Sequence, residues 1–248
     1  YGSTPASGVL IARFSPDSKF VLTAGNDSTA VLWSINGKKL QTFRGHSCRV
    51  IDVTFSPDGE KILTVGRDRT GKLWNTSGTE IKTFSQEFGR ISAAVFSSDG
   101  KYILTGGSAG YNELFLGQWS STGEKIKEVL VGNSNRLEAL AFSPDGKQVL
   151  LTDEDGNLTI WDFWENKEVS SINRHAERVD GVTFSPDATF ISTINLEKKV
   201  KLWNILDHST QTFKTKTFFY NHITFWPDGK SVLVIEDEIL TRFDLKGK

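Results

Sequence analysis

The chain has 248 residues, of which 29 are Lys or Arg and 30 are Asp or Glu, so its formal net charge is −1. This balance argues against a globally basic nucleic-acid-binding protein, and no apolar run approaches the ~20 residues of a membrane span. The single cysteine, Cys48, excludes an internal disulfide framework and predicts a reducing, cytoplasmic compartment.

The chain contains no Met, so we expect Tyr1 to follow a processing or cropping step. Removal of a signal peptide is therefore one of the alternatives.

One short motif recurs along the chain. Tetrapeptides of the FSPD type begin at intervals of 41 to 46 residues. Their first residues are Phe14, Phe55, Phe96, Phe142, Phe184 and Phe225. An aromatic anchor follows each of them, namely Trp33, Trp74, Trp119, Trp161, Trp203 and Phe243. The pattern predicts six copies of one structural unit.

Each unit predicts four short strands. In the second unit, residues 49–55 alternate with Ile51, Val53 and Phe55 on one face, as in a half-buried strand. The following Ser-Pro-Asp-Gly sequence fits a type I turn. Residues 61–65, 70–74 and 80–84 are the next three strands. Four strands every ~42 residues, without helical periodicity, predict the blades of an all-β propeller.

These residues resemble the WD40 (β-transducin-like) repeat family. The resemblance rests on Gly45-His46 before the first strand, FSPDG at the turn and Leu-Trp-Asn at residues 73–75, and it is closest to bacterial multi-repeat arrays. It implies four-stranded antiparallel blades in a single domain spanning residues 1–248, with six blades, or seven if the chain is cropped. The sixth unit ends before a fourth strand would be complete.

The resemblance also implies a buried polar set that holds each blade together. In the second unit this set is His46, Thr64, Asp68 and Trp74. In the fifth unit it is His175, Thr193 and Trp203, with Glu197 in place of the Asp. Trp33, Trp119 and Trp161 are the corresponding structural anchors elsewhere. Because the constellation occurs twice, we interpret it as structural and not as a catalytic triad.

A second repeated position suggests a function. Six residues before each Phe anchor lie Gly8, Arg49, Arg90, Arg136, Arg178 and Phe219. By resemblance this position lies on the top rim of the propeller, beside the central channel. Glu138 and Asp180 follow two residues after their arginines, and Arg67 occupies a turn on the same rim. The acids could neutralise part of this rim through salt bridges, which leaves the arc of Arg49, Arg67 and Arg90 more electropositive.

The sequence therefore predicts a non-catalytic interaction scaffold that binds a protein or peptide, acidic ones included, and belongs to a larger chain or complex. The alternatives are recognition of an anion or phospho-ligand by the arginines and a propeller enzyme. An enzyme would have to use Glu138, Glu154, Asp180 or Asp237. The four histidines and lone cysteine show no metal-ligand spacing, so no metal or cofactor is expected.

Overall fold

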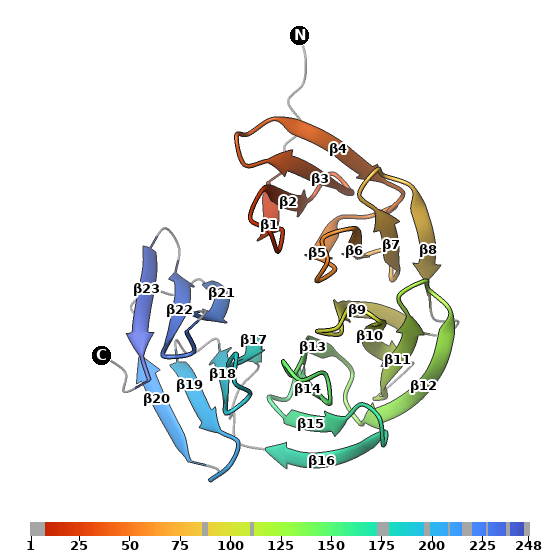
Figure 1. Ribbon diagram of the computed structural model, residues 1–248. Coiled ribbons are helices and arrows are strands. Elements are labelled where there is room, and N and C mark those ends of the chain that lie inside the picture. Colours follow the sequence, from red (N-terminus) through yellow and green to blue (C-terminus); the bar gives the residue numbers. More distant parts are fainter. Residues whose placement is uncertain are drawn as a thin grey trace. The chain divides into compact units, whose positions relative to one another are not determined.

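The computed structural model describes residues 8–85, 89–109, 112–172, 179–195, 199–207, 209–214, 220–226, 228–236 and 239–245. Every regular element in these ranges is a β-strand, and the strands form five four-stranded antiparallel sheets and one three-stranded sheet (Figure 1). Each sheet corresponds to one sequence repeat, so we number them blades one to six. The predicted all-β architecture of small antiparallel blades is confirmed.

The chain divides into two compact units, and the first, Tyr1–Asn135, contains blades one to three. Blade one consists of β1 (Val9–Phe14), β2 (Phe20–Gly25), β3 (Thr29–Ser34) and β4 (Lys39–Arg44). Blade two consists of β5 (Val50–Phe55), β6 (Lys61–Gly66), β7 (Gly71–Asn75) and β8 (Glu80–Phe84). Blade three consists of β9 (Gly89–Phe96), β10 (Tyr102–Ala109), β11 (Leu114–Ser120) and β12 (Lys125–Gly132).

The second unit, Arg136–Lys248, contains blades four to six. Blade four consists of β13 (Leu137–Phe142), β14 (Gln148–Asp153), β15 (Leu158–Asp162) and β16 (Lys167–Ile172). Blade five consists of β17 (Val179–Phe184), β18 (Phe190–Asn195), β19 (Lys199–Asn204) and β20 (Thr210–Lys214). Blade six has three strands in the described residues: β21 (Tyr220–Phe225), β22 (Ser231–Glu236) and β23 (Ile239–Asp244).

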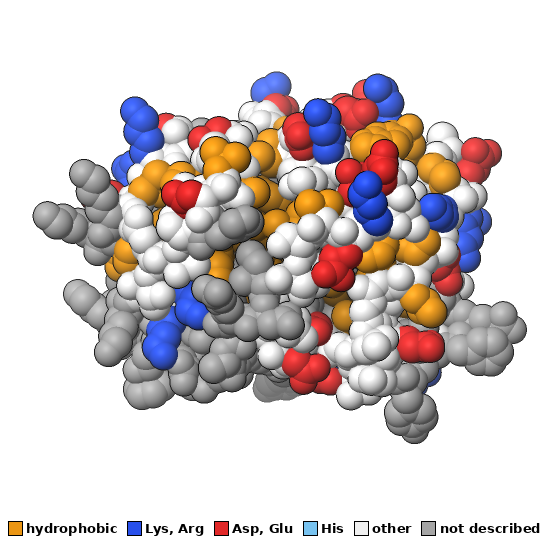
Figure 2. Space-filling view, turned by 90° about the horizontal axis from the view of Figure 1, so that it is seen from below, with side chains coloured by type: hydrophobic (Ala, Val, Ile, Leu, Met, Phe, Trp, Pro, Cys, Tyr) orange, Lys and Arg blue, Asp and Glu red, His pale blue; other side chains and the backbone are white. Residues whose placement is uncertain are grey.

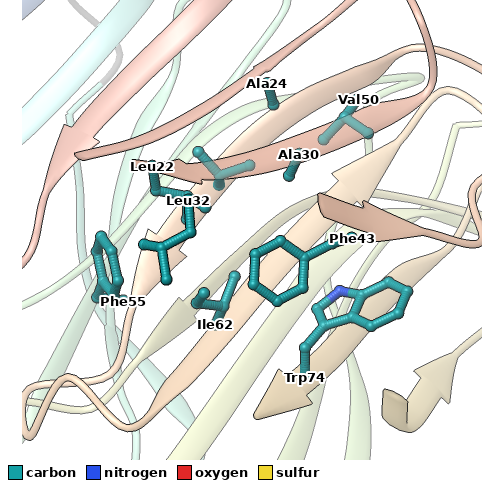
Figure 3. Packing of buried hydrophobic residues seen from close by; sticks show 10 residues of the cluster. Leu22, Ala24, Ala30, Leu32, Phe43, Val50, Phe55, Ile62 and Trp74 are labelled. Atoms are coloured by element: carbon teal, nitrogen blue, oxygen red, sulfur yellow. The ribbon is translucent and has the colours of Figure 1, made fainter. Parts of the chain in front are cut away.

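Adjacent blades are joined by apolar side chains that alternate along the strands. Leu22 and Leu32 of blade one pack with Val53 and Ile62 of blade two in one buried cluster (Figure 3). The last aromatic residue of one blade lies against the anchor of the next. The ring centroids are 5.8 Å apart for Phe43 and Trp74, 4.8 Å for Phe84 and Trp119, and 5.9 Å for Phe213 and Phe243. Phe243 thus occupies the Trp position of blade six.

The FSPDG segments form the predicted turns. In blade two the Gly59 amide donates to the Ser56 carbonyl at 2.9 Å, and Gly59 adopts a φ of 75°. The Ser56 hydroxyl accepts the Lys61 amide at 2.9 Å, which closes the turn onto the next strand. A Cβ added to Gly59 would lie 3.7 Å from Cδ of Pro16, so successive turns also touch.

The third repeat is the longest, with 46 residues between Phe96 and Phe142, and its extra residues lengthen one hairpin. β10 and β11 stay paired from Tyr102 with Ser120 to Ser108 with Leu114. Leu114 and Phe115 are each 1% exposed, so the apolar insertion adds to the core of blade three.

Candidate functional site

A chain of hydrogen bonds crosses blade two. The Trp74 indole donates to the Thr64 hydroxyl at 2.9 Å, and that hydroxyl donates to Nε2 of His46 at 2.8 Å. On the other side of the ring, Nδ1 of His46 donates to the Asp68 carboxylate at 2.8 Å. The structure therefore brings together the four polar residues that the sequence singles out in this repeat, and each buried donor or acceptor has a partner.

The electrostatics of this network favour a neutral histidine beside an ionised aspartate. Burial lowers the pKa of His46, although the Asp68 carboxylate opposes the change. Burial opposes ionisation of Asp68 as well, but hydrogen bonds from Thr70, Ser47 and His46 hold its pKa below the usual value. The ring of His46 lies over Gly66, where an added Cβ would be 2.4 Å from Nδ1. This tight packing leaves no room for a substrate beside the histidine.

The other anchors form the same indole contact where the sequence provides a hydroxyl. The bonds are Trp33 to Thr23 at 2.8 Å, Trp119 to Thr105 at 2.9 Å and Trp203 to Thr193 at 3.0 Å. In blade four, where Leu151 takes the threonine position, Trp161 donates to Asn166 at 3.4 Å. His175 and Glu197 lie outside the described residues.

A β-bulge interrupts the first strand of every blade at one position. The register of the first strand against the second skips a single residue in each sheet. The skipped residues are Leu10, Ile51, Ser92, Glu138, Asp180 and Asn221. Bulges redirect side chains and often occur next to functional sites. The sequence singles out this position because Glu138 and Asp180 occupy it in two repeats, but it does not predict the bulge.

In the first unit the backbone brings four arginines to one end of blades two and three. The Arg67 amide donates to the Arg49 carbonyl at 2.9 Å. The amide of Ile91, which follows Arg90, donates to the Arg69 carbonyl at 3.2 Å. Arg67, Arg69 and Arg90 are exposed and Arg49 is half-buried. We call these four residues the arginine patch. Arg69 lies two residues after Arg67 in the same turn and was not among the positions predicted from the sequence.

Two arginines of the patch have no carboxylate partner in the part of the chain that the structure describes. Neither Arg49 nor Arg90 forms an ion pair there. The side of the molecule in Figure 2 carries positive, negative and apolar side chains intermixed, in keeping with the net charge of −1.

Arg69 has a left-handed backbone conformation that belongs to its turn. Its φ is 72°, in the region where side chains with a Cβ are disfavoured by roughly 1–2 kcal/mol. At the equivalent turn position, Ser28 of blade one has a φ of 63° and Gly156 of blade four has a φ of 80°. The conformation therefore recurs in the repeat and is not specific to Arg69.

In the second unit an acid accompanies the arginine. Nε of Arg136 lies 3.1 Å from Oε1 of Glu138, whose side chain is 5% exposed. This pair is one of the salt bridges that the sequence suggests. Arg178 and Phe219 lie outside the described residues, as does the side chain of Asp180.

A second ion pair connects the first strands of blades one and two. Nη2 of Arg13 lies 3.8 Å from Oδ1 of Asp52, and each side chain is 32% exposed. Burial raises the pKa of Asp52, while the Arg13 charge and the Val53 amide counteract part of the rise. The pair is therefore a local contact between β1 and β5, and no histidine takes part in it.

The described residues contain no group of three or more His, Cys, Asp or Glu that could hold a metal ion. Among the acids proposed for an enzyme, Glu138 pairs with Arg136 and Asp237 lies outside the described residues. No helix in the described ranges has the length and apolarity needed to cross a membrane.

The chain matches a known family of β-propellers. The family described as "IFT122 first beta-propeller" matches residues 9–239. Protein hir1 of Schizosaccharomyces pombe is 25% identical over 130 residues, which are 47% of this chain and 14% of that protein. Small ribosomal subunit protein RACK1y of Oryza sativa is 27% identical over 122 residues, 46% of this chain and 36% of that protein.

A third relative has a name that describes its repeats. "WD repeat and SOCS box-containing protein 1" of Homo sapiens is 28% identical over 100 residues, 40% of this chain and 24% of that protein. The matched segments therefore span between 14% and 36% of the length of these three relatives.

Proposed function

Because the chain belongs to the family of the IFT122 first β-propeller, a WD40-repeat fold, we propose that it is a non-catalytic interaction domain whose arginine patch binds an acidic segment of a partner protein. Arg49, Arg67, Arg69 and Arg90 are the residues that carry this proposal. We propose further that residues 1–248 act as one domain of a larger chain or complex. The cytoplasmic location stays a prediction based on the single Cys48.

The backbone hydrogen bonds between the arginine-bearing loops support the patch as a prearranged site. A guanidinium ion is always charged and presents a planar set of donors that matches a carboxylate. Arg67 and Arg69 lie in a short turn, Arg90 lies in β9 and Arg49 directly precedes β5, which lowers the cost of ordering their backbones when a ligand binds. The rest of the described chain shows repeated structural contacts without a distinct chemical centre, which favours binding over catalysis.

The absence of an ion pair at Arg49 and Arg90 in the described part of the chain is the single observation that most favours a role for the patch. Arg136, at the same repeat position of blade four, pairs with Glu138. The guanidinium groups of Arg49 and Arg90 are therefore available to a carboxylate of a partner.

The test is binding of a fluorescent hexaglutamate peptide, followed by anisotropy. We expect the double variant Arg49→Ala with Arg90→Ala to bind about tenfold more weakly, which corresponds to ~1.4 kcal/mol. The binding should weaken with added salt, because exposed charges are screened beyond about 8 Å at physiological ionic strength.

A matched control is the double variant Lys19→Ala with Lys101→Ala. It removes the same charge from two FSPD-type turns at the opposite ends of the strands, where each lysine pairs with an aspartate. Its affinity for the peptide should equal that of the wild type. If both double variants weaken binding equally, or if only Arg136→Ala with Arg178→Ala abolishes it, the proposal is wrong. Binding of a phosphoserine peptide but not of hexaglutamate would identify a phosphate-specific site instead.

A further inference from the structure

A pocket lies between blades four and five, within the second unit, and it is separate from the arginine patch. Its volume is about 320 Å³. Its apolar walls are Ile160 of β15, Ile191 of β18, Trp203 of β19 and Ile205 in the turn after β19. Trp203 is 4% exposed, so the anchor indole of blade five forms an inner wall and not an exposed rim.

The pocket exists because one side chain on the outer strand of blade four is short. Ser170 of β16 pairs with Ile160, and the residues in the same register of blades one and two are Gln41 and Lys82. The Gln41 amide donates to the Ser77 carbonyl in the turn of the next blade. Lys82 lies against the corresponding turn of blade three, where a Cβ added to Gly123 would be 2.8 Å from the Lys82 Cβ.

A second replacement opens the same space. Lys61, at the first position of β6, extends its ammonium group to the Ser121 carbonyl of blade three at 2.8 Å. Blade four has Gln148 at the first position of β14, and it faces the pocket. The longer side chains that bridge blades two and three are thus replaced by shorter ones between blades four and five.

The polar groups of the pocket are available to a ligand. Within the described part of the chain, the side chains of Gln148 and Ser170 form no hydrogen bond. Asn204 also lines the pocket, but its side-chain oxygen accepts the Leu206 amide at 2.9 Å. No charged side chain is among the described residues that line the pocket.

We propose that the pocket between blades four and five binds one uncharged aromatic ring that carries a hydroxyl or N–H group. The Trp203 indole and three isoleucines provide the apolar contact, and aromatic rings gain additional energy from edge or offset packing on an indole. Gln148 and Ser170 provide the hydrogen-bonding partners for the polar group. The lack of charged lining residues disfavours an ionised ligand, because its charge would be desolvated without compensation.

The volume agrees with this ligand class. An apolar cavity of about 150 Å³ is sufficient to hold benzene. The present pocket is roughly twice that size and partly open to solvent, so a phenol or an indole fits with its polar group beside Gln148 and Ser170.

The test is a titration of the full chain with p-cresol or indole, followed in ¹H–¹⁵N NMR spectra. We expect saturable shifts that include the side-chain N–H signal of Trp203 and leave that of Trp74 unchanged. Sodium benzoate, a ring of similar size with a charge, should bind at least tenfold more weakly than p-cresol. Shifts spread evenly over the indole signals, or no saturable binding of p-cresol and indole, would overturn the proposal.

Variants of β16 test the position of the site. Ser170→Gln, which restores the residue of blade one, should weaken p-cresol binding at least tenfold. Glu168→Gln is the matched control, because Glu168 pairs with Trp161 and so faces the opposite side of the sheet from Ser170. If both variants bind p-cresol like the wild type, the pocket is not its site.

A capped Ser-Tyr-Ser peptide separates the two sources of such a ring. Binding of the peptide at least as tight as that of p-cresol, with the same Trp203 shift, indicates a tyrosine side chain of a bound polypeptide. Binding of p-cresol without the peptide indicates a free aromatic compound.

Discussion

Replacing Trp74 by alanine tests whether the anchor residues hold the blades together. Trp74 is 2% exposed, donates a hydrogen bond to Thr64 and packs edge-on against Phe43 of the preceding blade. Truncating a buried Trp costs about 3–5 kcal/mol. At roughly 2–4 °C per kcal/mol for a chain of this size, the melting temperature should fall by about 6–20 °C.

Trp164→Ala is the matched comparison, because it removes the same side chain from a turn. Trp164 is 57% exposed, and its ring contacts Phe163 at 5.0 Å. We expect a loss of about 1 kcal/mol, in the range of surface substitutions with some packing. Thermal melts followed by circular dichroism measure both variants. Equal shifts would refute the assignment of Trp74 as an anchor and Trp164 as a peripheral residue.

Four further predictions concern single positions. Gly66→Ala should destabilise blade two by about 2 kcal/mol or more, because its Cβ would lie 2.4 Å from Nδ1 of His46; urea denaturation measures this. Stability should decrease as the pH falls below 6.5, because the pKa of His46 is lowered in the folded state and the unfolded chain binds the proton more readily. His46→Gln should make the melting temperature less dependent on pH in this range. The pKa of Asp52 is raised in the folded state, so the folded protein favours the protonated carboxyl and loses stability as the pH rises above 3.8. Asp52→Asn should therefore raise the melting temperature more at pH 7 than at pH 3.5. Arg69→Gly should leave stability unchanged or raise it by up to about 1 kcal/mol while weakening hexaglutamate binding, and a variant that binds like the wild type would remove Arg69 from the site.

The repeat spacing was sufficient to predict the blades and the order of their strands. Predicted strands in the second repeat agree with β5 to β8 within one residue at each end. The Phe243 ring stacks on Phe213 as the sequence position of an anchor requires. These features are local or repeat six times, so spacing and alternation determine them.

The functional surfaces depend on contacts that spacing does not describe. Arg69 joins the patch through a backbone bond to blade three, and its left-handed conformation cannot be read from residue type. The pocket beside Ser170 is recognised by comparison with Gln41 and Lys82, which extend to the turn of the next blade from the same position of blades one and two. Such features require the positions of side chains from two repeats at once.

Observation of the arginine side chains during ligand binding tests the proposed function most directly. In ¹H–¹⁵N spectra of the wild type, titration with hexaglutamate should shift the Nε–H signals of Arg49, Arg69 and Arg90. The signal of Arg13, which pairs with Asp52, should stay in place. Saturable shifts in the three patch residues agree with the account. Binding that shifts Arg13 or Arg136 while leaving Arg49, Arg69 and Arg90 unchanged would contradict it.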